Sequence, residues 1–100
     1  MLEYLSNERK QELCKIMASN LPVFRAKANN MSQAELADRL GFTRQTISAV
    51  ENKQRDMQWS TFSSIVLFFS KDTEVAHLMT VMGVLDDDVI KTLNLQKDNN

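Results

Sequence analysis

The sequence predicts an all-α fold, a single compact bundle of five or six helices. Its 100 residues include only two glycines and one proline, so few residues interrupt helices. Apolar residues recur at helical spacing along the chain, and no alternating pattern of the kind that builds strands emerges. A hydrophobic content of 43% is enough for one modest core. We therefore expect one domain over residues 1–100.

The first segment carries an apolar stripe that continues across Pro22. Its members are Leu13, Ile16, Met17, Leu21, Phe24 and Ala28. The stripe fits either one kinked helix or two abutting helices. Asn20 is a competent N-cap, and a proline in the first turn of a helix loses no backbone hydrogen bond, which favours two helices. We expect an extra N-terminal helix over 6–19 and a second helix from residue 20.

The next segment, residues 32–53, has the pattern of two short helices joined at Gly41. Ser32 and Glu35 have the spacing of a capping box, which predicts the start of the first helix. Gly41 can adopt the left-handed conformation that ends a helix, and Thr43 is a suitable N-cap for the next one. The second helix has an apolar face with Ile47, Ala49 and Val50, and a polar face with Arg44, Gln45, Thr46 and Ser48.

Four groups of residues in this segment form a recognisable combination. They are SQAELA at 32–37, Leu40-Gly41, the run from Thr43 to Ser48, and Glu51-Asn52. Together they resemble the phage repressor and Cro-like family, the XRE-type helix-turn-helix transcriptional regulators. The resemblance runs from about Leu21 to Lys71, roughly half of the chain, and implies a repressor-like DNA-binding core over 20–71. A helix like the second one enters the major groove of double-stranded DNA in such proteins.

Base reading is expected from the first turns of the second helix. The guanidinium of Arg44 can donate two hydrogen bonds to a guanine, and the carboxamide of Gln45 can pair with an adenine. Ser48 and Ala49 lie one turn further on, where a hydroxyl can bond a base and a methyl group can contact thymine. We expect these four residues to read base edges, with Arg44 and Gln45 ranked first.

A second set of residues is expected to bind phosphates, which fixes the register of the protein on DNA without reading sequence. The family resemblance implies this role for Gln33, at the start of the first helix, and for Asn52, just past the second. By chemistry and position we add four more residues. These are Thr43, Thr46, Lys53 and Arg55.

The resemblance also implies a structural ion pair between Arg25 and Glu51. This chain departs from the family at two points, because one extra residue separates Arg25 from Gln33 and because Lys53 stands where glycine is common. A turn at Asn29-Asn30 can absorb the extra residue, since asparagine tolerates left-handed dihedral angles. The backbone conformation at Lys53 is the open question.

The C-terminal part predicts three more helices, over Trp59–Ser70, Asp72–Met82 and Asp86–Asn94, followed by a disordered polar tail at 96–100. The run Ile65–Phe69 is apolar almost all round, so it must be covered on more than one side. We expect residues 72–95 to form the interface of a homodimer. The N-terminal helix as the dimer interface, or a self-contained monomer, are the alternatives.

The net charge of −1 is low for a DNA-binding domain, but the charge is unevenly distributed. Residues 22–57 carry a net charge of +2 and residues 58–100 carry −3. We expect the acidic part to face away from the duplex. Nonspecific affinity is then weak at physiological salt, and useful binding requires two half-sites read by a dimer.

Other chemistries find little support. The single histidine, His77, and the single cysteine, Cys14, have no neighbours at metal-ligand spacing, so we expect no metal, no cofactor and no enzyme activity. We expect no signal peptide, and the longest aliphatic-aromatic run is too short to cross a bilayer. One cysteine and no membrane segment fit a protein of the cytoplasm.

The resulting hypothesis is a sequence-specific transcriptional regulator, by default a repressor, that binds an inverted repeat as a homodimer. The alternative is an antitoxin-like interaction protein. Such a protein binds a partner protein through its apolar C-terminal helices and regulates its own expression through the same DNA reader. The cluster Ile65–Phe69 motivates this alternative.

Overall fold

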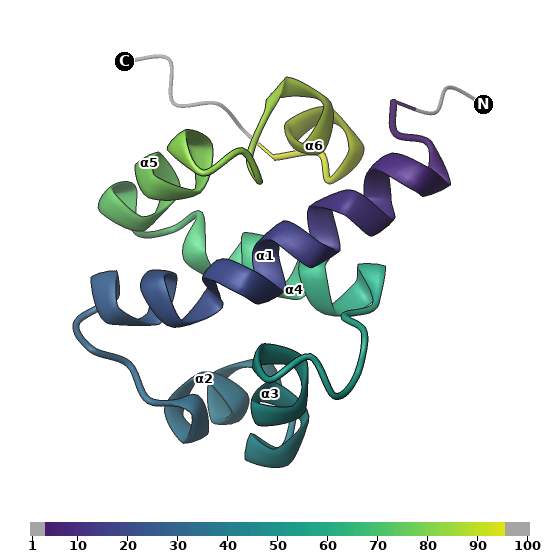
Figure 1. Cartoon of the computed structure of the whole chain (residues 1–100). Coiled ribbons are helices and arrows are strands. Elements are labelled where there is room, and N and C mark those ends of the chain that lie inside the picture. Colours follow the sequence, from purple (N-terminus) through teal and green to yellow (C-terminus); the bar gives the residue numbers. More distant parts are fainter. Residues whose placement is uncertain (1–3, 96–100) are drawn as a thin grey trace.

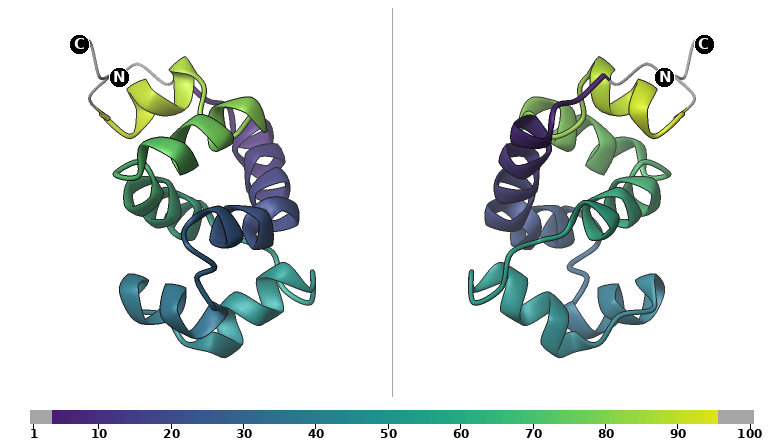
Figure 2. Two further views of the ribbon diagram at one scale, coloured as in Figure 1. Left: turned by 90° about the vertical axis from the view of Figure 1, so that its left-hand side faces the viewer. Right: turned by 90° about the vertical axis from the view of Figure 1, so that its right-hand side faces the viewer.

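The computed structural model describes residues 4–95, and within them the chain is all-helical. The helices are α1 (Asn7–Lys27), α2 (Gln33–Leu40), α3 (Arg44–Glu51), α4 (Trp59–Phe69), α5 (Thr73–Val81) and α6 (Asp87–Thr92). In Figure 1, α1 crosses the middle of the molecule, α2 and α3 lie at one end, and α5 and α6 lie at the other. The two side views in Figure 2 show the same division. The expectation of an all-α bundle is confirmed, while the tail at 96–100 lies outside the described residues.

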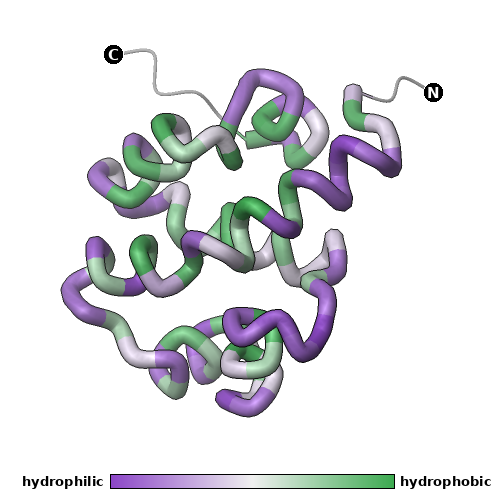
Figure 3. Tube along the Cα trace, in the orientation of Figure 1, coloured by the Kyte–Doolittle hydropathy of each residue, from purple (hydrophilic) through white to green (hydrophobic). Residues whose placement is uncertain are grey.

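The core is built around α4, the most apolar helix of the domain. Phe62, Ile65, Val66 and Phe69 are buried along it, and the tube in Figure 3 is green over the second half of this helix. Burying each such side chain contributes roughly 1.5–3 kcal/mol. Leu67 is the exception, because 45% of it is exposed. The apolar run of α4 is therefore covered mainly by this chain's own core.

The expectation of two abutting helices before residue 28 is wrong. Helix α1 continues through Pro22, and Asn20 does not cap a second helix but donates its side-chain N–H to the carbonyl of Ile16 at 2.8 Å. An interior proline costs about 3 kcal/mol. Because the helix is continuous, Leu21 and Phe24 lie on the same face as Leu13 and Met17, and both are fully buried. The free energy gained by burying Leu21 and Phe24 offsets the cost of the proline.

The connections between the helices follow the local signals in the sequence. Asn29 and Asn30 both adopt left-handed conformations, with φ of 61° and 57°, so the turn absorbs the extra residue as expected. Asp72 and Asp86 accept hydrogen bonds from the first turns of α5 and α6, which fixes where these helices begin.

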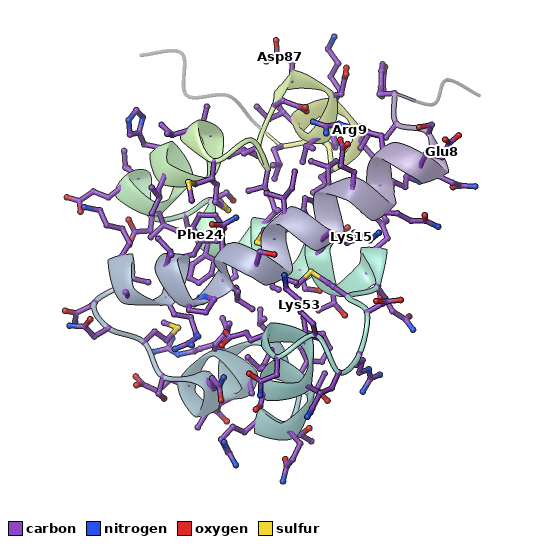
Figure 4. All side chains as sticks on the ribbon, in the orientation of Figure 1. Glu8, Arg9, Lys15, Phe24, Lys53 and Asp87 are labelled. Carbon is purple, nitrogen blue, oxygen red and sulfur yellow. The ribbon has the colours of Figure 1, made fainter. Side chains whose placement is uncertain are left out.

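The first turn of α1 is tied to the last helix. Arg9 Nη2 lies 3.2 Å from Asp86 Oδ2, and Lys91 Nζ lies 5.7 Å from the ring centroid of Tyr4. Figure 4 shows Arg9 beside α6. The N-terminal turns of α1 therefore pack on the C-terminal helices and leave the opposite end of the molecule to α2 and α3.

Candidate nucleic-acid interface

The geometry of the α2–α3 pair is set by three caps. The capping box of Ser32 and Glu35 is formed in both directions. Gly41 has φ of +76°, its N–H donates to the carbonyl of Asp38, and the next N–H, of Phe42, donates to Ala37 O at 2.8 Å. These two hydrogen bonds together form the Schellman motif that ends a helix. The caps make the direction of α3 relative to α2 a local property of residues 32–43.

Thr43 completes the turn by capping α3. Its Oγ1 accepts the N–H of Thr46 at 3.2 Å and lies 3.0 Å from the Thr46 hydroxyl. Thr43 is exposed and Thr46 is half-buried at the start of α3, and the hydroxyl of each already has a protein neighbour. They can still accept or donate a further bond, because a hydroxyl has one donor and two acceptor positions.

Helix α3 presents a polar outer face because its inner face is buried. Ile47 and Val50 pack in the core, with exposures of 1% and 3%. Arg44 and Gln45 are exposed in the first turn, and within residues 4–95 the side chain of neither forms a hydrogen bond or an ion pair. Their donors and acceptors are therefore available to an external ligand.

Further along α3, Ser48 and Asn52 are linked to each other, since Asn52 Nδ2 lies 3.4 Å from Ser48 Oγ. Ala49 is half-buried and follows on the same helix. These three side chains lie beyond the first turn, as the sequence predicted. Ser48 and Asn52 form an exposed polar contact that either side chain can exchange for a bond to another polar group.

The end of α3 shows which backbone conformation Lys53 adopts at the position where glycine is common in the family. The N–H of Lys53 donates to Val50 O at 3.2 Å and the N–H of Gln54 donates to Ala49 O at 2.9 Å, another Schellman ending. Lys53 occupies the left-handed position of this ending with φ of +61°. A lysine there carries backbone strain of about 1 kcal/mol that glycine avoids. Lys53 and, two residues on, Arg55 are both exposed.

The ion pair between Arg25 and Glu51 is present, and it includes a third residue. Arg25 Nε and Nη2 donate to the two carboxylate oxygens of Glu51, each at 2.8 Å, and Nη1 donates to the carbonyl of Met31 at 2.9 Å. Gln33 Nε2 also donates to Glu51 Oε1 at 2.8 Å. The sequence did not indicate this bond from Gln33. The second N–H of the same amide forms no hydrogen bond within residues 4–95.

The charges at the helix starts set α3 and α4 apart from the other helices. Helices α1, α2, α5 and α6 each carry an acidic residue in the first turn, whereas α3 and α4 carry none. Helix α3 begins instead with Arg44, which adds to the positive end of its dipole. Such a start is unfavourable for an isolated helix and favourable next to an anion.

The described residues offer little for metal binding or for thiol chemistry. Within residues 4–95 no three side chains of His, Cys, Asp or Glu gather in a way that could hold a metal ion. Burial raises the pKa of the Cys14 thiol to about 11, so it stays protonated near neutral pH. None of the helices in this part of the chain has the length and hydropathy needed to span a membrane.

Comparison with known proteins gives two matches. The helix-turn-helix family model matches residues 24–57, which include α2, α3 and the ion pair. The chain is also 34% identical over 76 residues to the control protein C.SmaI of Serratia marcescens, and the match covers 76% of this chain and 87% of that protein. No solved structure matches the chain significantly.

Proposed function

Since the chain belongs to the XRE-type helix-turn-helix family of DNA-binding transcriptional regulators, we propose that it reads a specific duplex sequence with the outer face of α3. One observation carries the proposal. Arg44 and Gln45 lie exposed and unpartnered, among the described residues, in the first turn of a helix whose other face is locked into the core. This is the part of such a helix that meets base edges in the major groove.

The residues around α3 fall into two groups by chemistry. Arg44 and Gln45, with Ser48 and Ala49 behind them, read bases. Phosphates are bound by the remaining polar residues, which surround α3 and fix its register on the duplex. They are Gln33, Thr43, Thr46, Asn52, Lys53 and Arg55. The family is one of regulators and not a class of enzyme, so this site binds DNA without changing it.

The regulator acts as a homodimer on an inverted repeat and represses transcription by occupying a promoter in the cytoplasm. Two half-sites are needed because a net charge of −1 gives little nonspecific affinity. The dimer forms through the C-terminal helices, where Val81, the last residue of α5, is 65% exposed. A second copy of α5 can cover this side chain and remove its apolar surface from water.

The alternative of an antitoxin-like interaction protein loses its main support. It rested on the cluster Ile65–Phe69, and Ile65, Val66 and Phe69 are buried in this chain's own core. Phe68 is half-buried and packs against the same core. Leu67 is the exposed member of this cluster, at 45%, so most of the cluster needs no outside protein to cover it.

Selection of bound sequences from a pool of random duplexes tests the reader. Wild-type protein is expected to return an inverted repeat, and the double variant Arg44→Ala, Gln45→Ala is expected to lose it. Ser60→Ala, at an exposed position of α4 outside the expected dimer interface, is a control that keeps the motif. Enrichment of no sequence by the wild type, or of the same motif by the double variant, contradicts the proposal.

Sedimentation equilibrium tests the assembly separately. The wild type is expected to sediment as a dimer, and Val81→Asp is expected to sediment as a folded monomer that binds the inverted repeat weakly. Val23→Asp, at an exposed position of α1, tests the N-terminal helix as the interface instead. Dissociation by Val23→Asp but not by Val81→Asp would move the dimer interface to α1.

A further inference from the structure

A groove of about 700 Å³ lies between the first half of α1 and the segment that follows α3. Four basic residues line it, Lys10 and Lys15 from α1 and Lys53 and Arg55 from the segment after α3, against a single acidic residue, Asp56. Figure 4 shows Lys15 on α1 and Lys53 facing α1 from below. The whole chain is slightly acidic, so this concentration of positive charge is local.

The basic residues of the groove are largely free to bind an anion. Within residues 4–95, Lys15, Lys53 and Arg55 form no ion pair or hydrogen bond through their side chains, and all three are exposed. Lys10 is half-buried, with its ammonium 5.4 Å from the ring of Trp59. Like charges that face each other across a groove repel, so this arrangement is most favourable when an anion lies between them.

The backbone at Lys53 gives independent support. Its φ of +61° belongs to the position at which glycine is least strained, and no other residue in the segment after α3 is held this way. Strain at a residue whose side chain enters a groove is typical of a functional site. We therefore expect the Lys53 side chain to have a binding role in the groove, which offsets the strain of its left-handed backbone.

We propose that this groove binds the sugar–phosphate backbone of the duplex that α3 reads, with Lys15 as a phosphate ligand opposite Lys53 and Arg55. The inference rests on the proposed function and extends the interface from the helix pair to α1. Contiguity favours duplex DNA over a free anion, because Lys53 follows α3 by two residues. A backbone held along α3 passes the mouth of the groove.

Two substitutions test the groove from its two walls. Lys15→Gln removes a charge from the surface of α1, and Lys53→Gly removes a charge while relieving the left-handed strain. Each is expected to weaken binding to specific and scrambled duplexes alike by several-fold at 0.1 M salt. Each should also lower the slope of log K against log salt by about 0.9, the value for one phosphate contact. The selected base sequence should stay the same.

Lys71→Gln is the matched control, because Lys71 is an exposed lysine outside the groove. It is expected to leave the slope unchanged. Urea unfolding separates binding from folding, since Lys53→Gly should be at least as stable as the wild type. A purely structural role for Lys53 would appear as lost stability with unchanged DNA binding, and would overturn the proposal.

The remaining outcomes are equally decisive. If the wild type binds the selected duplex and both groove variants keep the wild-type slope, the groove does not bind DNA while the proposed function stands. A further outcome is that sodium tripolyphosphate raises the melting temperature of the wild type but not of Lys15→Gln, while both proteins bind DNA equally well. In that case the groove is a site for free anions and the proposal is wrong. A wild type that binds no duplex overturns the proposed function as well.

Discussion

Arg25 and Glu51 join the end of α1 to the end of α3 through two parallel hydrogen bonds of 2.8 Å. Only 16% of the Arg25 side chain and 5% of the Glu51 side chain are exposed. The pair is therefore well shielded from water, and the same carboxylate holds Gln33. Glu51 thus links the reading helix both to the core and to the start of α2.

Removing one partner of this pair should damage folding more than base preference. Glu51→Ala leaves the Arg25 guanidinium shielded from water without its carboxylate, which we expect to cost about 3 kcal/mol in the free energy of unfolding, measured in urea. Glu12→Ala, which breaks the exposed pair between Glu12 and Arg9, should cost less than about 1 kcal/mol. Equal losses for the two variants would contradict the architectural role of Glu51.

Gln45→Ala should relax base preference at one position in each half-site. Losing a bidentate contact to a base costs roughly 1–3 kcal/mol of binding free energy, and other positions should keep their preferences. Titration against a set of duplexes with single base changes measures this. A uniform loss over all duplexes would instead assign Gln45 to phosphate binding.

Gln33→Ala should show the opposite pattern. It removes a predicted phosphate contact, so all duplexes should bind more weakly and by a similar factor. It also removes the hydrogen bond to Glu51, which should lower stability by about 1.5 kcal/mol. Binding is therefore measured well below the unfolding transition. A change in the preferred sequence is the result that this assignment does not allow.

Gly41→Ala should destabilise the protein through backbone strain alone. Nothing lies within 4 Å of a Cβ added at Gly41, so there is room for the methyl group. The φ of +76° remains unfavourable for alanine, and we expect a loss of about 1 kcal/mol in urea unfolding. Ala34→Ser, at an exposed position of the same helix, should change stability far less. A neutral Gly41→Ala would show that the turn can relax.

Stability should fall between about pH 9 and pH 11 because of Cys14. Burial raises the pKa of its thiol from 9.0 to about 11, so in this range the folded protein keeps a proton that the unfolded chain releases. Deprotonation then favours the unfolded state, and the loss grows as the pH rises. Urea midpoints of Cys14→Ala should lack this component. An identical alkaline decline in the variant would assign it to other groups.

The sequence by itself determined the local structure of the DNA-binding end. Helix caps act over three or four residues, so Ser32 with Glu35, Gly41 and Thr43 fixed both helices and the turn between them without help from the rest of the fold. The polar face of α3 followed from the same short-range periodicity. The family pattern supplied the pairing of Arg25 with Glu51.

Only the tertiary structure decided what depends on packing between distant segments. Helix α1 passes through Pro22 because its apolar stripe stays buried against α4, which local propensity opposes. The bond from Gln33 to Glu51 and the groove that sets Lys15 opposite Lys53 bring together residues far apart in the chain. Which residues become neighbours in this way depends on the angles at which the helices pack. The sequence around an exposed lysine such as Lys15 does not indicate which distant residues it will face.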